Sequence, residues 1–398
     1  MRIMHLCLGC FYVDGYSYQE NMLPKYHLRQ GHEVEIVASL ESFDSTGEAS
    51  VLDTCPEPYT NEYGIQVTRL DYRFGGALRK FRKYVGLKEA LVKFEPELLF
   101  IHGCQFGDMK IVVDYLKQHP KVKVYVDNHA DYSNSATGWL SKNVLHRIYW
   151  RRQAKLIEPF TEVFWGVLPA RVDFLVENYH LPRPKCQLLV MGADDEEVEK
   201  ALMPGKMSKV RSELGVADDE ILLVTGGKID LAKTQIIALM EAVIKDPDSR
   251  VKLLVFGPVV DQLRDRVLSL AEHNRIIYRG WATSSQSYGY FAAADLVVFP
   301  GRHSVYWEQV AALGKPLLVK RWAGTDHIDM GGNLRFTQGD SESELRESYR
   351  QIIDDEEVLS SMKSRAAEVA ENFLYSSIAQ KSIGEEHKEN RIDDVVRN

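Results

Sequence analysis

The chain has 398 residues, of which 45% are hydrophobic and 27% charged, and its net charge is −8. That length suggests two domains that each bury a core, and the composition excludes collagen-like, intrinsically disordered and disulfide-scaffold proteins. No apolar run approaches the roughly 20 residues that cross a bilayer, and the first residues do not have the pattern of a secretory leader. We therefore expect a cytoplasmic protein.

In the first half, short apolar runs typical of buried strands alternate with segments of helical periodicity. Continuous apolar strands separated by helices imply a parallel sheet that is covered on both faces. The predicted strands are 2–8, 33–38, 98–102, 122–126 and 162–166, and the predicted helices include 18–30, 106–118 and 142–158.

The same pattern restarts in the second half, with predicted strands at 221–227, 251–257, 275–280, 295–300 and 315–320. We expect two doubly wound α/β domains, 1–193 and 194–372, with a linker near 194–206. A C-terminal helix at about 373–398 is expected to pack back on the first domain. Ligands of such sheets bind beyond the carboxyl ends of the strands, so two facing sheets would enclose a cleft.

The restart of the pattern carries the most informative motif, ILLVTGGKIDLAKT. A strand runs into Gly226 and Gly227, Lys228 follows, and Lys233 stands where the next helix opens. Glycines let a backbone approach a ligand closely, and a helix N-terminus with two ammonium groups can hold an anion. Neither a Walker A loop nor a G-x-G-x-x-G fingerprint is present. Taken alone, the two lysines also fit a solvated face.

A second candidate follows the predicted strand at 295–300. A short loop there leads into a helix that carries Glu308, at the end of the sheet where ligands bind. A carboxylate in that place can accept two hydroxyl hydrogen bonds, as a ribose diol would offer, or it can be an ordinary helix-surface glutamate.

These pieces, in this order, resemble the GT-B glycosyltransferases of the retaining, nucleotide-sugar-dependent family 4. GGKIDLAK is similar to the family's G-R-x-x-x-x-K-G region, with Lys in place of Arg. PGRHSVYWEQVAALGKP is similar to its P-S…E…E-A-x-x-x-G-x-P region, and Gly31-His32-Glu33-Val34 and LLVMGADDEE also resemble family segments. The resemblance covers nearly the whole chain. It implies a GT-B fold of two facing Rossmann-like domains, an acceptor domain followed by a donor domain.

The resemblance also implies roles for single residues. Lys228 and Lys233 would hold the donor diphosphate and stabilise the leaving nucleotide, which departs as an anion. Glu308 would bind the ribose hydroxyls, and His129 would contact the transferred sugar. The other implied donor-site residues are Gly15, Tyr16, Gly227, Arg279, Gly280 and Trp281, the last three beside the nucleobase.

The family's E-x7-E motif is incomplete, because Pro300 stands where its first glutamate belongs. His303 or Ser304 would take over contacts to the sugar, although His303 fits a structural loop role equally well. No metal is expected to be required. The D-x-D at 246–248 follows a helix at the far end of the sheet, where a solvated turn is favoured over a metal site.

The net charge hides an uneven distribution. Residues 1–193 hold 23 Lys and Arg against 22 Asp and Glu, whereas residues 194–398 hold 26 against 35. Two basic stretches with interleaved apolar residues, 73–94 and 146–155, are typical either of solvated helix faces or of helices on anionic membranes. No nucleic-acid partner is expected, because the domain charge is balanced and RNA-binding motifs are absent.

The predicted function is transfer of a sugar from a UDP- or GDP-sugar to a hydroxyl of a glycan or lipid-linked glycan, with retention, in polysaccharide or glycolipid biosynthesis. Such a hexosyltransferase-type enzyme would be cytoplasmic, with peripheral contact at the inner face of the membrane. A nucleotide-sugar epimerase and a phosphorylase-like enzyme are alternatives in the same fold. The missing first glutamate also leaves open a non-catalytic nucleotide-sugar-binding partner.

Overall fold

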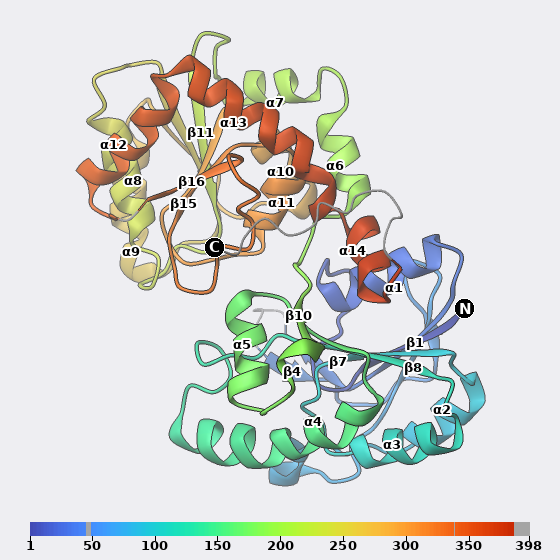
Figure 1. The fold of residues 1–398 in the computed structure, drawn as a ribbon. Helices are drawn as coiled ribbons and strands as arrows, with labels where there is room; N and C mark the ends of the chain where they lie inside the picture. Colours follow the sequence, from blue (N-terminus) through green and yellow to red (C-terminus); the bar gives the residue numbers. More distant parts are fainter. Residues whose placement is uncertain (45–48, 338, 386–398) are drawn as a thin grey trace. The chain divides into compact units, whose positions relative to one another are not determined.

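The computed structural model describes residues 1–44, 49–337 and 339–385. The chain divides into two compact units (Figure 1). Unit 1 comprises Met1–Val190 together with Tyr375–Asn398, and unit 2 comprises Met191–Leu374. Residues 386–398 of the predicted C-terminal helix lie outside the described residues.

The main sheet of unit 1 has the strand order β10-β9-β8-β7-β1-β2-β6-β5. All neighbouring strands are parallel except β5 and β6, which pair antiparallel. The chain begins in the middle at β1, moves outward on one side and then crosses to β7, so the switch point lies between β1 and β7. The strands are β1 Arg2–Cys7, β2 Glu33–Ala38, β5 Tyr59–Thr60, β6 Gln66–Arg69, β7 Leu98–His102, β8 Lys123–Asn128, β9 Val163–Gly166 and β10 Cys186–Leu188.

The last described helix, α14, belongs to unit 1 and packs against α1 (Figure 1). The Gln30 side chain donates to the Ser376 carbonyl at 2.8 Å, and the Trp165 indole donates to the Ser382 carbonyl at 2.9 Å. The helices of this unit are α1 Gln19–Arg29, α2 Leu87–Phe94, α3 Met109–Gln118, α4 Arg151–Ile157, α5 Pro169–Glu177 and α14 Tyr375–Ser382. Shorter helical turns are η1 Gly76–Phe81, η3 Glu158–Phe160 and η4 Arg183–Lys185, whereas η2 Ser141–Trp150 is a π-helix that runs directly into α4. The strands β3 Glu41–Phe43 and β4 Ala49–Val51 pair antiparallel.

The sheet of unit 2 is parallel throughout, with the order β13-β12-β11-β14-β15-β16 and a switch point between β11 and β14. Its apolar strands and covering helices share a buried core. The strands are β11 Ile221–Gly226, β12 Val251–Phe256, β13 Ile276–Tyr278, β14 Leu296–Phe299, β15 Leu317–Lys320 and β16 Leu334–Thr337. The helices are α6 Asp195–Leu202, α7 Lys206–Leu214, α8 Gln235–Ile244, α9 Asp261–Ala271, α10 Ser284–Ala292, α11 Tyr306–Ala312, α12 Glu342–Ile353, α13 Glu356–Val369 and η5 Ala370–Phe373.

The predicted strands are all present, with ends within two residues of the predicted ones. The predicted linker at 194–206 is wrong, because its first part forms α6. The Asp194 side chain accepts from the Glu196 backbone N–H and caps that helix, whose first turn is acidic. None of the helices in the described ranges combines the length and the apolar character that crossing a bilayer requires.

Candidate functional site

Three glycine turns lie together at the carboxyl edge of the unit 2 sheet. Gly227 follows β11, Gly257 follows β12 and Gly280 follows β13, and their φ angles are +116°, +127° and +51°. A Cβ on Gly257 would lie 2.2 Å from the Gly227 carbonyl oxygen, and the Gly257 N–H donates to the Gly280 carbonyl. These positions therefore need glycine, and they leave the edge of the sheet open to a ligand. Gly257 was not among the predicted residues, although it follows a strand in the same way as Gly227.

The two lysines differ in their surroundings. Lys228 is exposed directly after the Gly227 turn, whereas Lys233 is half-buried at the start of α8. Burial lowers the pKa of Lys233, while Asp230 opposes the shift. Asp230 also shapes the turn, since its carbonyl accepts from the Lys233 N–H at 2.9 Å. Lys233 is thus a cation that is partly stripped of water, which strengthens its attraction for an anion.

The loop after β14 lies beside these lysines. A Cβ on Gly301 would be 3.6 Å from Cγ of Lys233, and one on Gly227 would be 3.9 Å from the Tyr306 ring. The structure therefore brings the Gly227 turn, Lys233 and the loop of His303 and Ser304 to the switch point of one sheet. Such a place is the usual ligand site of doubly wound sheets.

Glu308 is fully buried at the centre of a hydrogen-bonded hub. Its Oε1 accepts from Nε2 of His303 at 2.9 Å and from Nε2 of His327 at 2.6 Å. Burial alone would raise the pKa of Glu308, but the two histidines hold it well below its ordinary value. Its Oε2 is buried without a hydrogen-bond partner. Glu308 therefore ties the loop after β14 to the loop after β15, and one carboxylate oxygen is left over.

The hub also offers three metal-ligand atoms within 4.8 Å of one another. Sequence spacing did not reveal this cluster, because His327 comes from a loop that carried no predicted site residue. The contacts to Glu308 have hydrogen-bond lengths, and Nδ1 of His327 has no partner, whereas metal-bound histidines normally donate their second nitrogen to an outer group. We interpret the cluster as a hydrogen-bonded hub.

Gln309, next to Glu308, was also overlooked. The motif E-A-x-x-x-G-x-P places its glutamate five residues before the glycine, and the residue five before Gly314 is Gln309 rather than Glu308. The Gln309 side chain is buried, and its Oε1 has no hydrogen-bond partner. The spacing of the motif itself was the signal that could have identified this residue.

The predicted nucleobase residues follow β13. The Arg279 N–H donates to the Val255 carbonyl at 3.0 Å, which anchors the segment to β12. The Trp281 side chain is 72% exposed. An indole left in solvent offers a flat apolar face on which a base can stack.

In unit 1, Gly15 and Tyr16 lie on the loop after β1. The Gly15 N–H donates to Oε1 of Glu62 at 2.8 Å, and Gly15 has a φ of +79°. The Tyr16 ring packs against Tyr18 and Phe43, with centroids 5.2 and 5.8 Å away. The contacts described for Gly15 and Tyr16 therefore go to Glu62, to Tyr18 of the same loop and to Phe43 of β3.

His129 follows β8, and its side chain is 29% exposed. Its Nε2 is buried and lies 3.4 Å from Oδ2 of Asp127. The exposed part of the His129 ring is therefore not its Nε2.

The two basic stretches of unit 1 lie side by side. The rings of Phe81 and Tyr149 pack edge to face at 5.2 Å, and the Tyr149 hydroxyl is 3.4 Å from the Phe81 carbonyl. Part of the first stretch is structural, because Arg82 pairs with Glu41 at 2.9 Å and also donates to the Gly9 carbonyl. The first stretch is not one amphipathic helix but the short turn η1 and the separate helix α2.

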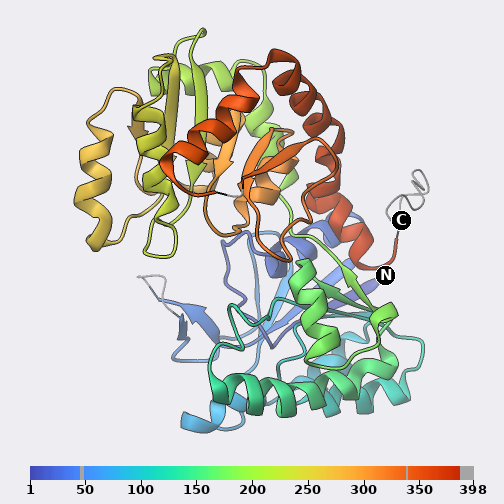
Figure 2. The ribbon, with the colours of Figure 1, turned by 60° about the vertical axis from the view of Figure 1, so that its left-hand side comes forward.

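Residues 141–157 form a continuous helix, drawn in green in Figure 2. Leu140, Val144 and Ile148 recur every four residues and are 67%, 42% and 65% exposed, and Trp139 beside them is 72% exposed. We call these four residues the 139–148 face. Exposed apolar residues on one helix face, with arginines in the same helix, form an amphipathic surface.

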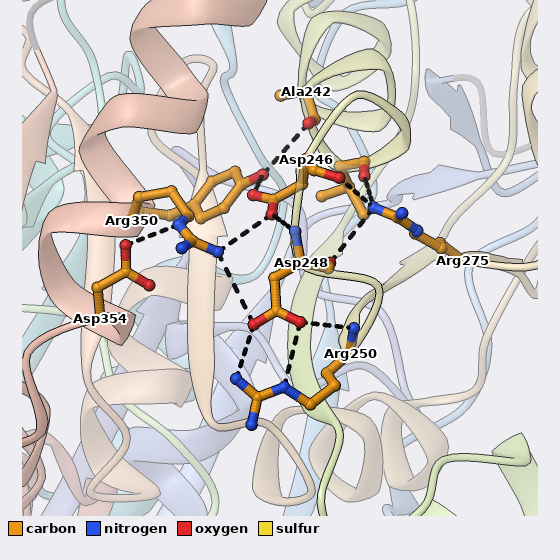
Figure 3. A network of polar contacts seen from close by, with 9 residues as sticks. Ala242, Asp246, Asp248, Arg250, Arg275, Arg350 and Asp354 are labelled. Carbon is orange, nitrogen blue, oxygen red and sulfur yellow. Dashed lines mark hydrogen bonds and ion pairs between the residues drawn. The ribbon is translucent and has the colours of Figure 1, made fainter.

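The D-x-D at 246–248 is an ion-pair network (Figure 3). Asp246 is buried and accepts from the Tyr349 hydroxyl at 2.7 Å and from Arg350 at 3.1 Å. Arg250 lowers the pKa of Asp248 to about 2. The predicted solvated turn is therefore wrong for Asp246, whose carboxylate joins α8 to α12.

No family model matches the chain. A curated relative, the mannosylfructose-phosphate synthase of Agrobacterium fabrum, is 23% identical over 229 residues, which cover 53% of this chain and 50% of that protein. The chain thus spans about half the length of the curated relative that it matches.

Several solved structures share the fold. A glycosyltransferase from Rickettsia africae has a TM-score of 0.65 at 14% identity, with 96% of both chains covered. Anabaena Alr3699/HepE in complex with UDP-glucose has a TM-score of 0.62 at 18% sequence identity, with 96% of this chain and 98% of that one covered. UDP-GlcNAc 2-epimerase from Neisseria meningitidis has a TM-score of 0.58 at 12% identity, with the same coverage. The predicted fold class is confirmed: the chain has the GT-B fold with two Rossmann-like units.

Proposed function

We propose that the protein is a GT-B glycosyltransferase of the family 4 type, which transfers a sugar from a nucleotide-diphosphate sugar to a hydroxyl of a glycan or lipid-linked glycan. The observation that carries the proposal is the switch point of unit 2, where Lys233, the Gly227 turn and the loop of His303 adjoin one another. Both the partial match to a mannosylfructose-phosphate synthase and the fold shared with a protein that binds UDP-glucose support it.

In the proposed reaction the site acts by stabilising charge. A nucleoside diphosphate leaves with negative charge, so fixed cations that meet its phosphates lower the barrier. Half-buried Lys233 and exposed Lys228 supply those cations, and the glycine turns admit the phosphates to backbone N–H groups. In the proposed reaction the leaving phosphate assists attack from the same face, which retains configuration, and no metal is required.

The nucleoside would lie against Arg279, Gly280 and Trp281. Two neighbouring side chains are candidates for its ribose, the unpartnered Oε2 of Glu308 and the unpartnered Oε1 of Gln309. Nucleotides that lack the 2′- and 3′-hydroxyls separate the two candidates. The residue that binds ribose is the one whose substitution (Glu308→Ala or Gln309→Ala) abolishes the affinity difference between the natural and the dideoxy nucleotide.

In unit 1, His129 would contact the transferred sugar, with Gly15 and Tyr16 on the loop after β1 at the same edge of the sheet. The 139–148 face and the arginines of its helix favour an acceptor at an anionic lipid surface. The protein would then work in the cytoplasm as a peripheral membrane protein.

A nucleotide-sugar epimerase is the second candidate, and the fold shared with a UDP-GlcNAc 2-epimerase favours it. A panel of UDP- and GDP-sugars, each with and without glycan acceptors, distinguishes the candidates. Release of nucleoside diphosphate that depends on an acceptor supports transfer. Conversion of the sugar without an acceptor identifies an epimerase, a requirement for phosphate identifies a phosphorylase-like enzyme, and binding without turnover identifies a non-catalytic partner.

A further inference from the structure

A chain of four buried side chains runs through unit 1 to the neighbour of His129. Nδ1 of His27 lies 3.0 Å from Nε2 of His5, and Nδ1 of His5 lies 3.0 Å from Nε2 of His102. Nδ1 of His102 lies 2.8 Å from Oδ2 of Asp127. All four side chains are completely buried, and they come from α1, β1, β7 and β8. We call these four residues the histidine relay.

The relay is anchored at its far end by the C-terminal helix. Nε2 of His27 lies 3.0 Å from the Ala379 carbonyl, which can only accept, so this nitrogen carries the hydrogen. The Ser382 hydroxyl also donates to that carbonyl, at 2.8 Å, and its oxygen is 3.1 Å from Nε2 of His27. The helix α14 therefore fixes the tautomer of His27.

That anchor determines the hydrogens along the chain. A neutral His27 accepts at Nδ1, so His5 must donate from Nε2. A neutral His5 then accepts at Nδ1, so His102 must donate from Nε2. His102 faces Asp127 with its other nitrogen, and one further proton lies between these two groups. If all three imidazoles were neutral and the carboxylate were ionised, the relay would hold three ring protons on nitrogen. The contacts require four, so the relay holds one additional proton.

Electrostatics assigns that proton to His102. Burial opposes its charged form, but Asp127 raises the pKa of His102 to about 9. Burial would also raise the pKa of Asp127, yet His102 and His129 hold it far below its ordinary value. Burial lowers the pKa of His27 to about 3 and that of His5 well below its usual range. The relay thus ends in a buried imidazolium–carboxylate pair.

The other ionisable groups around His102 and Asp127 do not oppose the charges on this pair. Cys7 on β1 and Glu20 on α1 also favour the His102 cation. Cys10 and Cys104 lie close enough to interact with Asp127, and burial raises the pKa values of both thiols, that of Cys104 to about 12, so both stay neutral near neutral pH.

We propose that the histidine relay is a positioning device: by holding His102 as a cation, it keeps the Asp127 carboxylate ionised and fixed beside His129. Asp127 then orients the buried Nε2 edge of His129, which lies 3.4 Å away. His102, His5 and His27 act on the ligand only through His129. The contact of His129 with a sugar rests on the proposed function, but the charge assignment does not.

NMR of the full-length protein with isotope-labelled histidine tests the assignment without any substitution. We expect the wild-type His102 ring to give the signature of an imidazolium at pH 7, and the His5 and His27 rings to remain neutral down to pH 5. A neutral His102 at pH 7 would overturn the proposal. In Asp127→Asn, the His102 ring is expected to become neutral at pH 7.

The link to His129 is tested in His102→Gln, which removes the cation and frees the Asp127 charge. The NMR signals of the His129 ring should move away from their wild-type positions, because the carboxylate 3.4 Å from its Nε2 has lost its other partner. The control is His146→Gln, because His146 is also buried in unit 1 but bonds to the Tyr179 hydroxyl outside the relay. Unchanged His129 ring signals in folded His102→Gln would contradict the proposal. Absent sugar transfer in the wild type would contradict the proposed function alone.

Discussion

Oε1 of Glu308 lies 2.6 Å from Nε2 of His327, and both side chains are completely buried. Glu308 comes from α11 and His327 from the loop after β15, so this contact joins that helix to that loop. His303 completes the hub from the loop after β14. A buried carboxylate that accepts two hydrogen bonds through one oxygen favours one arrangement of these segments, so its charge should contribute to the stability of unit 2.

Glu308→Gln should lower the free energy of unfolding by about 1–3 kcal/mol at pH 7, because the charged acceptor of two buried donors is lost. The pKa of Glu308 is lowered in the folded protein, so its stabilisation is present above the ordinary glutamate pKa and is lost as the pH falls below it. Denaturant unfolding from pH 7 to pH 3 should therefore show the difference from the wild type shrinking. The control is Glu213→Gln, which changes an exposed ion pair on α7. If this control lowered the free energy of unfolding as much as Glu308→Gln does, the stabilising role of the Glu308 hydrogen bonds would be contradicted.

Gly257→Ala should destabilise the protein by more than about 2 kcal/mol, since the new methyl group would clash with the Gly227 carbonyl at a φ that only glycine adopts readily. Gly205 also has a positive φ, of +77°, but no atom lies near the position of its Cβ. Gly205→Ala therefore measures only the cost of placing a side chain on a left-handed backbone, about 1 kcal/mol. Thermal unfolding measures both variants. Equal losses would mean that the two glycine turns do not pack as described.

The double substitution Leu140→Ser with Ile148→Ser should weaken binding to vesicles that contain anionic phospholipid by about tenfold or more, because it removes two exposed apolar side chains from the 139–148 face. Co-sedimentation measures the bound fraction. Leu268→Ser, which changes an exposed leucine on α9 of unit 2, is the matched control. If the wild type does not bind these vesicles, the proposed membrane contact is wrong.

Much of the fold could be predicted from the sequence because its strands are continuous apolar runs that parallel sheets bury on both sides. The elements that were missed include six short strands. β3, β4, β5, β6, β10 and β16 have only two to four described residues each, too few for a periodicity to mark them. The helix α6 carried a clear start signal in Asp194 and the acids after it, but the nearby Pro204-Gly205 favoured a linker.

Residues of the candidate site could be predicted only where they directly follow a strand at the edge of the sheet. Lys233 and the loop of His303 adjoin one another because their strands flank the switch point, which the strand order alone implies. The hub and the histidine relay were not predictable, because their members are brought together by tertiary packing. His27 and Ser382 are 355 residues apart, and only the return of α14 to unit 1 makes them partners.

The central claim is that the switch point of unit 2 binds a nucleoside diphosphate through Lys233, and calorimetric titration of UDP and GDP tests it most directly. We expect the wild type to bind at least one of them, and Lys233→Ala to bind it about tenfold or more weakly, as the loss of a charged hydrogen bond implies. Lys209→Ala, at an exposed lysine on α7, should bind like the wild type. Wild-type affinity in Lys233→Ala, or no binding of either nucleotide by the wild type, would contradict the account.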